Sequence, residues 1–390
     1  MKRKILSLKG IDIPMLILIL LLLIFGSVMV FSASAPYAES NHNDAYYYAK
    51  RQVIWALIGC AGMLFCAALS PEAHKKYTAP IGFGVAAVLL IVVLFTGGAI
   101  KRWISIGAFT FQPSELMKPM LILVMARYME WAQPIIKRNG IYRCGSLFGK
   151  ISDKRLFLRS SLYGVFIPTA IVSLVCVLIM LENHFSGTLI TFCIGAIVIF
   201  SGGACLRWFA GAGAVMGAGV FAVLFGTDYA SERIDIWLHP ESFSVSDETW
   251  QITQGLIAIG SGGFFGTGLG KGMQKQLYVS AAHNDFIFSI VCEELGFLGG
   301  IAVIVLFYLF TRRAITLAYG TDTLFSSLVS VGIAGHVALQ AFLNVGVVTG
   351  TIPNTGVTLP FFSYGGSALV VLLCEAGILL SVTKKERNII

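Results

Sequence analysis

Long apolar runs, separated by shorter polar segments, extend over most of the chain. Windows of about 19 residues, enough for a helix to cross a hydrocarbon core roughly 30 Å thick, predict ten membrane-spanning helices. The predicted spans are residues 13–33, 52–69, 79–97, 113–132, 163–181, 187–204, 207–226, 285–311, 323–350 and 364–383. This pattern predicts an all-α polytopic membrane protein with a single integral membrane domain over residues 1–390.

The polar segments between these spans differ in their content of basic residues. With the N terminus inside the cell, 19 of the 28 Lys and Arg residues fall in inner segments and 7 in outer segments, while Lys118 and Arg127 lie within a span. Because cytoplasmic loops collect Lys and Arg, the distribution predicts cytoplasmic N and C termini. It also explains most of the net charge of +8, so that charge does not call for a nucleic acid partner.

One outer segment, residues 227–284, forms a large extracytoplasmic loop between the seventh and eighth predicted spans. Loops of this length usually have a function. Its stretch "ETWQITQGLIAIGSGGFFGTGLG" mixes large apolar residues with a glycine cluster. We expect short amphipathic helices on the membrane surface and a tight turn packed against them.

The eight cysteines have no paired spacing, and they fall in apolar runs or in or beside predicted inner segments. Thiols in these places are not exposed to an oxidising compartment. The sequence therefore predicts no disulfide and no metal site built from thiols.

Charged residues at membrane depth are costly, and they usually pair with one another or serve function. In "KRWISIGAFTFQPSELMKPM", Lys101 and Arg102 lie in an external loop, and Glu115 and Lys118 begin a span. Glu115 and Lys118 share a helical face and could neutralise each other. Arg102 suits a phosphate or pyrophosphate, because its guanidinium group binds such oxygens bidentately. Its alternative role is that of an interface anchor.

A second polar pair, Glu182 and His184 in "LENHFSGT", lies at an external helix junction. The pair could tune a proton, or it could cap the ends of two helices.

The stretch "SAAHNDFIFSIVCEELGF" places three carboxylates at the start of the eighth span. Asp285 at the helix start could react, or it could cap the helix by accepting hydrogen bonds from free amides. Glu293 and Glu294 lie deeper and point about 100° apart on a helix, so they cannot share one partner. We expect at least one of them to pair with Arg, Lys or a backbone end inside the bundle.

The external end of the last two spans, "TGTIPNTGVTLPFFSYGGSALV", contains prolines and glycines that break any regular helix. Irregular backbone at this depth must be buried in protein or line a cavity. We expect Pro360, Gly365 and Gly366 to shape the cavity that contains Asp285. The glycines of "GTGLGKG" match neither the dinucleotide nor the phosphate-loop spacing, so a nucleotide site is not predicted there.

Six ordered blocks make the chain resemble the SEDS family (shape, elongation, division and sporulation). They are "VMVFSAS", "YYAKRQVIWALIG", "RWISIGAFTFQPSELMK", "QITQGLIAIGSGGFFGTGLG", "HNDFIFSIVCEELGFLGG" and "NTGVTLPFFSYGGSALV". The resemblance covers nearly the whole chain and is closer to the FtsW and SpoVE branch than to RodA. It implies a peptidoglycan glycosyltransferase that polymerises lipid II at the outer face of a bacterial cytoplasmic membrane.

The resemblance also assigns roles to residues. Asp285, in the "DFIF" block, corresponds to the family's proposed catalytic aspartate and would take the proton of the acceptor sugar hydroxyl. Binding of substrate and pyrophosphate, directly or with a divalent cation, falls to a set of polar side chains. This set comprises Arg102, Lys101, Lys275, Glu115, Lys118 and Ser363. Structural support is expected from Glu293, Glu294, Pro360, Gly365 and Gly366.

Two positions depart from the family pattern. "LENHFSGT" replaces the frequent "QPDLGT", which puts His184 where many members have an aspartate, so no catalytic role is assigned there. Asn354 replaces a frequent lysine, which weakens any phosphate-binding role for that loop.

Two other functions compete with catalysis. The same cavity could move lipid II across the membrane, but a flippase needs polar residues that continue across the midplane, and here they cluster toward the external side. Alternatively, the protein could be a non-catalytic scaffold for a class B penicillin-binding protein, the partner that the family resemblance implies, together with other cell-wall or division machinery. A pure scaffold would not require Asp285.

Overall fold

The computed structural model describes residues 8, 10–95, 102–106, 109–137, 154–204, 208, 211, 237, 247–279 and 282–384. Its helices are α1 (Ile13–His42), α2 (Tyr47–Ala68), α3 (Pro71–Ala73), α4 (Ala79–Phe95), α5 (Pro113–Lys137), α6 (Lys154–Ser161), α7 (Ile167–Leu181), α8 (Phe185–Ser201), α11 (Asp247–Ser261), α12 (Ile287–Tyr319), α13 (Leu324–Val348) and α14 (Gly366–Val382). Two π-helical turns, η1 (His74–Thr78) and η3 (Leu162–Phe166), precede α4 and α7. A short hairpin, β1 (Ile104–Ile106) and β2 (Phe109–Phe111), precedes α5.

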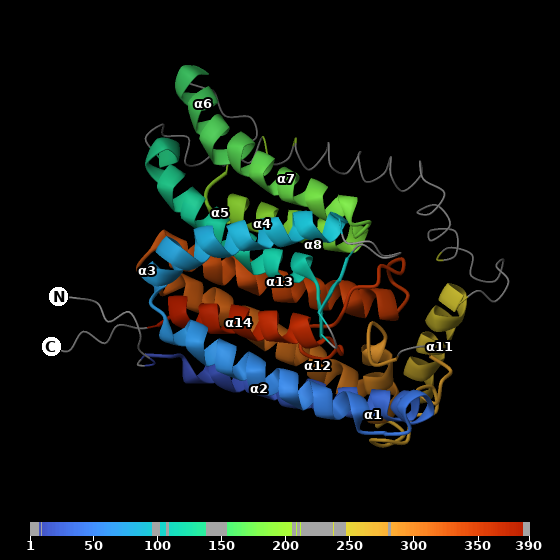
Figure 1. Cartoon of the computed structure of the whole chain (residues 1–390). Helices are drawn as coiled ribbons and strands as arrows, with labels where there is room; N and C mark the ends of the chain where they lie inside the picture. Colours follow the sequence, from blue (N-terminus) through green and yellow to red (C-terminus); the bar gives the residue numbers. More distant parts are fainter. Residues whose placement is uncertain are drawn as a thin grey trace.

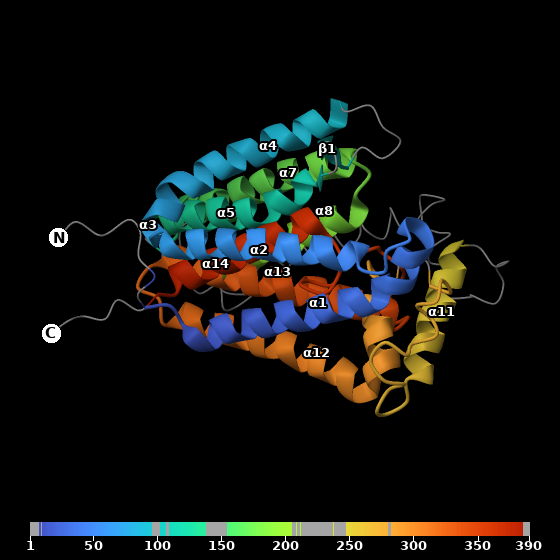
Figure 2. The ribbon, with the colours of Figure 1, turned by 60° about the horizontal axis from the view of Figure 1, so that its bottom comes forward.

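The long helices lie side by side along one direction, and the start of α1 and the end of α14 lie at the same end of the bundle (Figures 1 and 2). We call this the terminal end and the opposite one the distal end. At the terminal end, the Ser381 hydroxyl donates to the carbonyl of Leu69, and Arg313 binds the carboxylate of Asp12. α11 lies at the distal end, beside α12 (Figure 2).

Six helical segments in the described part of the chain are long and apolar enough to cross a membrane: 13–42, 47–68, 71–95, 157–181, 287–319 and 324–348. α8 and α14 are shorter apolar helices, and α5 occupies the predicted span that carries Glu115 and Lys118. The prediction of an all-α polytopic membrane protein is confirmed. The predicted span 207–226 and the first part of the long loop lie outside the described residues, apart from three isolated positions.

The eighth predicted span is broken, which the hydropathy pattern did not indicate. Gly296, inside α12, has φ 68° and ψ −166°, values that interrupt the helix and that glycine adopts most easily. The loop after α11 fills the break, because the amides of Phe297 and Leu298 donate to the carbonyls of Gly263 and Phe264. The glycine cluster thus forms a turn packed against α12, and it keeps the backbone of the break hydrogen-bonded.

α2 and α14 approach each other closely through glycines. A Cβ on Gly377 of α14 would lie 2.3 Å from the carbonyl oxygen of Met63, and one on Gly59 of α2 would lie 2.4 Å from the Leu373 side chain. Small residues at such positions allow two helical backbones to pack in a membrane. This contact holds α14 against α2, and the loop that directly precedes α14 lies at the distal end.

Candidate functional site

A cavity of about 410 Å³ lies at the distal end of the bundle. Its wall combines α2, the hairpin, the start of α5, the junction of α7 and α8, the segment before α12, α13 and the loop before α14. The charged or titratable side chains that line it are Arg51, Arg102, Glu115, Lys118, His184, Asp285 and Tyr364. The cavity therefore brings together predicted site residues from four separate parts of the sequence.

Asp285 lies two residues before α12 and lines the cavity. The N-cap position of α12 is Phe286, and no side chain caps this helix, so the alternative that Asp285 acts as a helix cap is wrong. The backbone carbonyl of Asp285 accepts a hydrogen bond from Asn344 of α13 at 2.7 Å. Burial raises the pKa of the Asp285 carboxyl above its ordinary value.

The loop before α14 holds the Asp285 segment in place. The amide of Tyr364 donates to the carbonyl of His283 at 2.8 Å, and the Ser363 hydroxyl donates to the carbonyl of Asn284 at 2.8 Å. The same hydroxyl accepts the amide of Leu359 at 2.7 Å. Ser363, predicted to bind substrate, thus uses its hydroxyl to join two segments of backbone and is not part of the cavity wall.

Glycines of this loop provide close contacts beside Asp285. Gly356 has φ 63°, and a Cβ there would come within 3.5 Å of the Asp285 carboxylate. A Cβ on Gly366 would lie 2.2 Å from the indole nitrogen of Trp55. Both Gly365 and Gly366 line the cavity, whereas Pro360 borders a smaller pocket behind it.

Glu115 and Lys118 form the expected ion pair at 2.8 Å, and both line the cavity. The Lys118 side chain is 3% exposed and also lies 3.5 Å from the amide oxygen of Gln340. Gln340 is in turn fixed by two hydrogen bonds from its amide nitrogen to Thr358, at 3.0 and 3.1 Å. Lys118 is thus a buried cation held at the cavity wall by two partners.

Arg102 reaches the cavity from the segment before β1, while Lys101 lies outside the described residues. The guanidinium of Arg102 donates to the carbonyls of Glu182 and Asn183, with the Nε contact at 3.2 Å. These bonds orient the arginine at the helix junction between α7 and α8.

Glu182 and His184 occupy the ends of α7 and α8, but neither side chain makes a capping hydrogen bond. Burial lowers the pKa of His184 to about 4 and raises the pKa of Glu182 to about 8. His184 lies 3.3 Å from the amide nitrogen of Gln112 and 3.4 Å from the Ser114 hydroxyl. His184 is therefore a cavity wall residue without charge at pH 7, while the Glu182 carboxyl binds its proton more tightly than an ordinary glutamate.

Lys275 does not line this cavity. Its ammonium lies 2.6 Å from the Glu294 carboxylate and 3.0 Å from the Ser32 hydroxyl, and the side chain is 4% exposed. The prediction that Lys275 binds pyrophosphate is corrected accordingly, because Lys275 is enclosed by Glu294 and Ser32 away from the wall of the cavity that contains Asp285. The expectation that one of the two deep glutamates pairs with a basic residue is confirmed.

Glu293 binds backbone rather than another side chain. Its carboxylate accepts the amides of Met273 at 2.6 Å and Gln274 at 3.0 Å. Glu294 accepts the amide of Gly270 at 3.0 Å in addition to its contact with Lys275. The two glutamates thus hold the loop after α11 against α12, as residues with a structural role would.

Sequence analysis did not select two features of the site. Arg51 of α2 lines the cavity, with its guanidinium carbon 4.4 Å above the ring of Tyr47. On α13, His336, Gln340 and Asn344 are spaced by four residues, which places them on one helical face. That spacing, in "HVALQAFLN", was the available signal, because polar residues in an apolar span usually face the protein interior.

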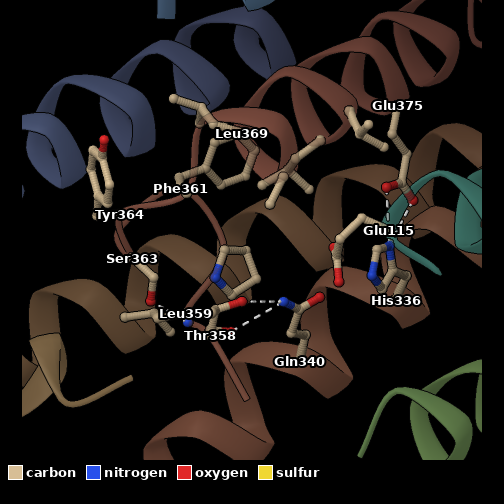
Figure 3. A pocket seen from close by; sticks show the side chains of 15 residues that line it. Glu115, His336, Gln340, Thr358, Leu359, Phe361, Ser363, Tyr364, Leu369 and Glu375 are labelled. Carbon is tan, nitrogen blue, oxygen red and sulfur yellow. Dashed lines mark hydrogen bonds and ion pairs between the residues drawn. The ribbon is translucent and has the colours of Figure 1, made fainter. Parts of the chain in front are cut away.

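Behind the cavity lies a smaller pocket of about 40 Å³, bordered by Glu115, Gln340, His336 and Glu375 (Figure 3). It shares Glu115, Gln340 and Thr358 with the wall of the larger cavity. The described residues include no group of three or more His, Cys, Asp or Glu side chains that could hold a metal ion. The charged side chains that line the larger cavity are three cations, Arg51, Arg102 and Lys118, and two carboxylates, Glu115 and Asp285.

The chain is similar to known proteins over nearly its whole length. The model of the FtsW, RodA and SpoVE family, described as cell cycle protein, matches residues 13–388. A probable peptidoglycan glycosyltransferase FtsW from Geobacter sp. (strain M18) is 37% identical over 385 residues, covering 97% of this chain and 98% of the relative. Stage V sporulation protein E of Bacillus subtilis (strain 168) is 35% identical over 384 residues, covering 96% of this chain and 98% of the relative.

Solved structures have the same fold. A chain of a peptidoglycan synthase complex superposes with a TM-score of 0.74 at 24% identity, covering 96% of this chain and 98% of that one. The rod shape determining protein RodA of Thermus thermophilus superposes with a TM-score of 0.66 at 26% identity, covering 96% and 97%. Matches of this extent, in sequence and in structure, place the chain in the FtsW, RodA and SpoVE family of cell cycle proteins.

Proposed function

We propose that the chain is a peptidoglycan glycosyltransferase that polymerises lipid II, with Asp285 as the general base. The observation that carries the proposal is the Asp285 carboxyl in a cavity that also holds Arg51, Arg102 and Lys118. The relatives named peptidoglycan glycosyltransferases support the reaction class.

The reaction that fits this site is an inverting transfer. The acceptor sugar hydroxyl attacks the anomeric carbon of the donor, a carbon–oxygen bond to the donor's diphosphate breaks, and a β-glycosidic bond forms. Asp285 takes the hydroxyl proton, which typically contributes 10²- to 10⁴-fold in rate. Burial raises its pKa, which makes the carboxylate a stronger base.

The leaving diphosphate needs cationic partners. Arg51, Arg102 and Lys118 come from α2, the segment before β1, and α5, so they approach the cavity from separate walls. Such fixed charges stabilise the negative charge that develops on the leaving group. A divalent cation, when present with the substrate, would supply further positive charge for the same stabilisation.

The proposed function also implies a membrane, an orientation in it and a partner protein. The distal end faces outward, the two termini are cytoplasmic, and the protein lies in the cytoplasmic membrane of a bacterium. The charge distribution of the sequence supports this orientation. Its partner would be a class B penicillin-binding protein, and the similarity to a chain of a peptidoglycan synthase complex is consistent with that assignment.

Polymerisation of labelled lipid II tests the proposal. Purified chain, with and without its penicillin-binding partner, would be compared with Asp285→Ala and Asp285→Asn. We expect glycan strands from the wild type and a loss of at least about 10²-fold in both variants. Normal polymerisation by folded Asp285→Asn would remove Asp285 as the base. Absence of polymerisation by the wild type, with transport of lipid II across vesicles, would favour the flippase.

A further inference from the structure

Two ionisable residues that the proposed chemistry does not use lie buried against each other in the bundle. His336 of α13 and Glu375 of α14 are 3% and 1% exposed. The Nδ1 atom of His336 lies 2.9 and 3.0 Å from the two carboxylate oxygens of Glu375. Because an ionised carboxylate only accepts hydrogen bonds, Nδ1 is the donor in this pair.

The pair lies near the middle of both helices, which run from 324 to 348 and from 366 to 382. A buried pair at this depth contributes little net stability, because desolvation offsets the attraction. Replacing such a pair with apolar residues is often neutral or stabilising. A functional role therefore explains the pair better than stability does.

The pair borders the small pocket that adjoins the candidate active site. Its bond to Glu375 leaves Nε2 of His336 buried, with no hydrogen-bond partner in the described part of the protein. Figure 3 shows the Glu115 carboxylate between the amide of Gln340 and the imidazole ring. The pocket volume of about 40 Å³ accommodates water, which needs about 10–15 Å³. One water can donate to both Nε2 and Glu115.

We propose that His336 and Glu375 form a positioning pair that holds Glu115 and so leaves more of the positive charge of Lys118 available to the diphosphate of the substrate. Glu375 orients the imidazole, as a carboxylate that accepts the second ring N–H orients a metal-ligating histidine. Through the bridging water, Nε2 then holds Glu115 from the inner side, while Lys118 binds Glu115 at 2.8 Å from the other. Because Glu115 also accepts a hydrogen bond on the His336 side, its carboxylate neutralises the charge of Lys118 less than a carboxylate that binds Lys118 alone would. This inference rests on the proposed function.

Two variants separate positioning from stability. His336→Asn keeps a donor near the place of Nδ1 and so keeps Glu375 hydrogen-bonded, but it removes the group that faces the pocket. The double variant His336→Leu with Glu375→Leu replaces the whole pair with apolar side chains. Thermal melting would show that each variant is folded.

The first readout is affinity for undecaprenyl diphosphate, measured on the full chain in nanodiscs. We expect both variants to bind about tenfold more weakly, which corresponds to about 1.4 kcal/mol. In lipid II polymerisation, KM should rise about tenfold while kcat changes less than twofold, because the pair does not touch the reacting atoms.

The role of Glu115 is tested in a Glu115→Gln background. An amide cannot neutralise Lys118, so His336→Asn should have no further effect on affinity there. Arg313→Met serves as the control, because it breaks an ion pair with Asp12 at the terminal end and should leave affinity unchanged.

Wild-type affinity in both folded variants would overturn the inference, as would an equal loss of affinity with and without Glu115. If either of these results is found while the wild type binds undecaprenyl diphosphate and polymerises lipid II, the proposed function stays intact. A wild type that neither binds undecaprenyl diphosphate nor polymerises lipid II would overturn the proposed function, and the inference with it.

Discussion

At the scale of the residue, Asp285 lies two residues before a helix, a common place for an aspartate, but its carboxyl is buried. The backbone around it is held by Asn344, Ser363 and Tyr364, which come from α13 and the loop before α14. In the described part of the chain, no hydrogen bond to the Asp285 carboxylate is found. The backbone is thus fixed while the carboxylate stays available for a substrate proton.

This environment predicts that Asp285→Asn stabilises the fold at neutral pH. Burial raises the pKa of Asp285 in the folded state, so the folded protein binds the proton more tightly than the unfolded one. The cost of the ionised form is fully present above the folded pKa and disappears below the unfolded pKa, ordinarily near 3.8. Thermal melting should show a higher Tm for Asp285→Asn at pH 7 and a smaller difference toward pH 4.

The pH profile of polymerisation gives a second check on the same group. Because the base must be ionised, the rate should fall with decreasing pH through a value above the ordinary aspartate pKa. A lower Tm of Asp285→Asn than of the wild type at pH 7 would contradict the buried position of the Asp285 carboxyl. So would a wild-type polymerisation rate that stays unchanged down to the ordinary aspartate pKa.

The sequence alone could predict that Asp285 belongs to the site, but it could not predict that Lys275 lies away from the site in an ion pair. Asp285 stands at the start of an apolar run, and its position next to a helix end follows from local pattern. Lys275 follows the glycine turn that packs against α12, so its ion pair with Glu294 depends on a tertiary contact. Arg51 was missed for the same reason, since its approach to the cavity depends on the packing of α2 against α14.

At the scale of the element, the hydropathy pattern located the membrane-spanning helices. It did not predict where a helix is interrupted or which side of a helix is polar. An average over 19 residues does not register one glycine, so the interruption of α12 at Gly296 was not predicted. It also hides the polar face of α13, because three polar residues in an apolar window barely change the mean. The hairpin before α5 has strands of only three residues, too short for a periodic signal.

The contact between α2 and α14 predicts that Gly377→Ala destabilises the protein by about 1–3 kcal/mol. Its Cβ would lie 2.3 Å from the carbonyl oxygen of Met63, which is backbone and cannot rotate away. Thermal melting in detergent measures the change. Gly84→Ala in α4 is the matched control, because no atom lies within 4 Å of its Cβ.

In that control, alanine should stabilise the helix by about 0.5–1 kcal/mol, since it loses less backbone freedom than glycine on folding. A displaced α14 would also move the loop that fixes Asp285. Gly377→Ala should therefore lower polymerisation as well as Tm. Equal Tm values for the two variants would show that α2 and α14 can separate without cost.

At the scale of the whole molecule, the bundle has two unlike ends. The distal end contains the cavity, with charged groups contributed by several elements, and the terminal end contains the start of α1 and the end of α14 (Figure 1). A substrate with a long isoprenoid tail and a polar head needs both an apolar surface and a polar cavity near the interface. A catalyst embedded in the bilayer provides both.

The excess of Lys and Arg in the predicted inner segments predicts the orientation of this bundle, with the distal end outside the cell. Single cysteines in a cysteine-free background test it. Thr351→Cys lies at an exposed distal position, and Lys76→Cys at an exposed position of the terminal end. A membrane-impermeant maleimide should label Thr351→Cys in intact cells, and Lys76→Cys only after permeabilisation. The reverse pattern would place the cavity in the cytoplasm, where polymerised glycan could not reach the cell wall, and would exclude the proposed function.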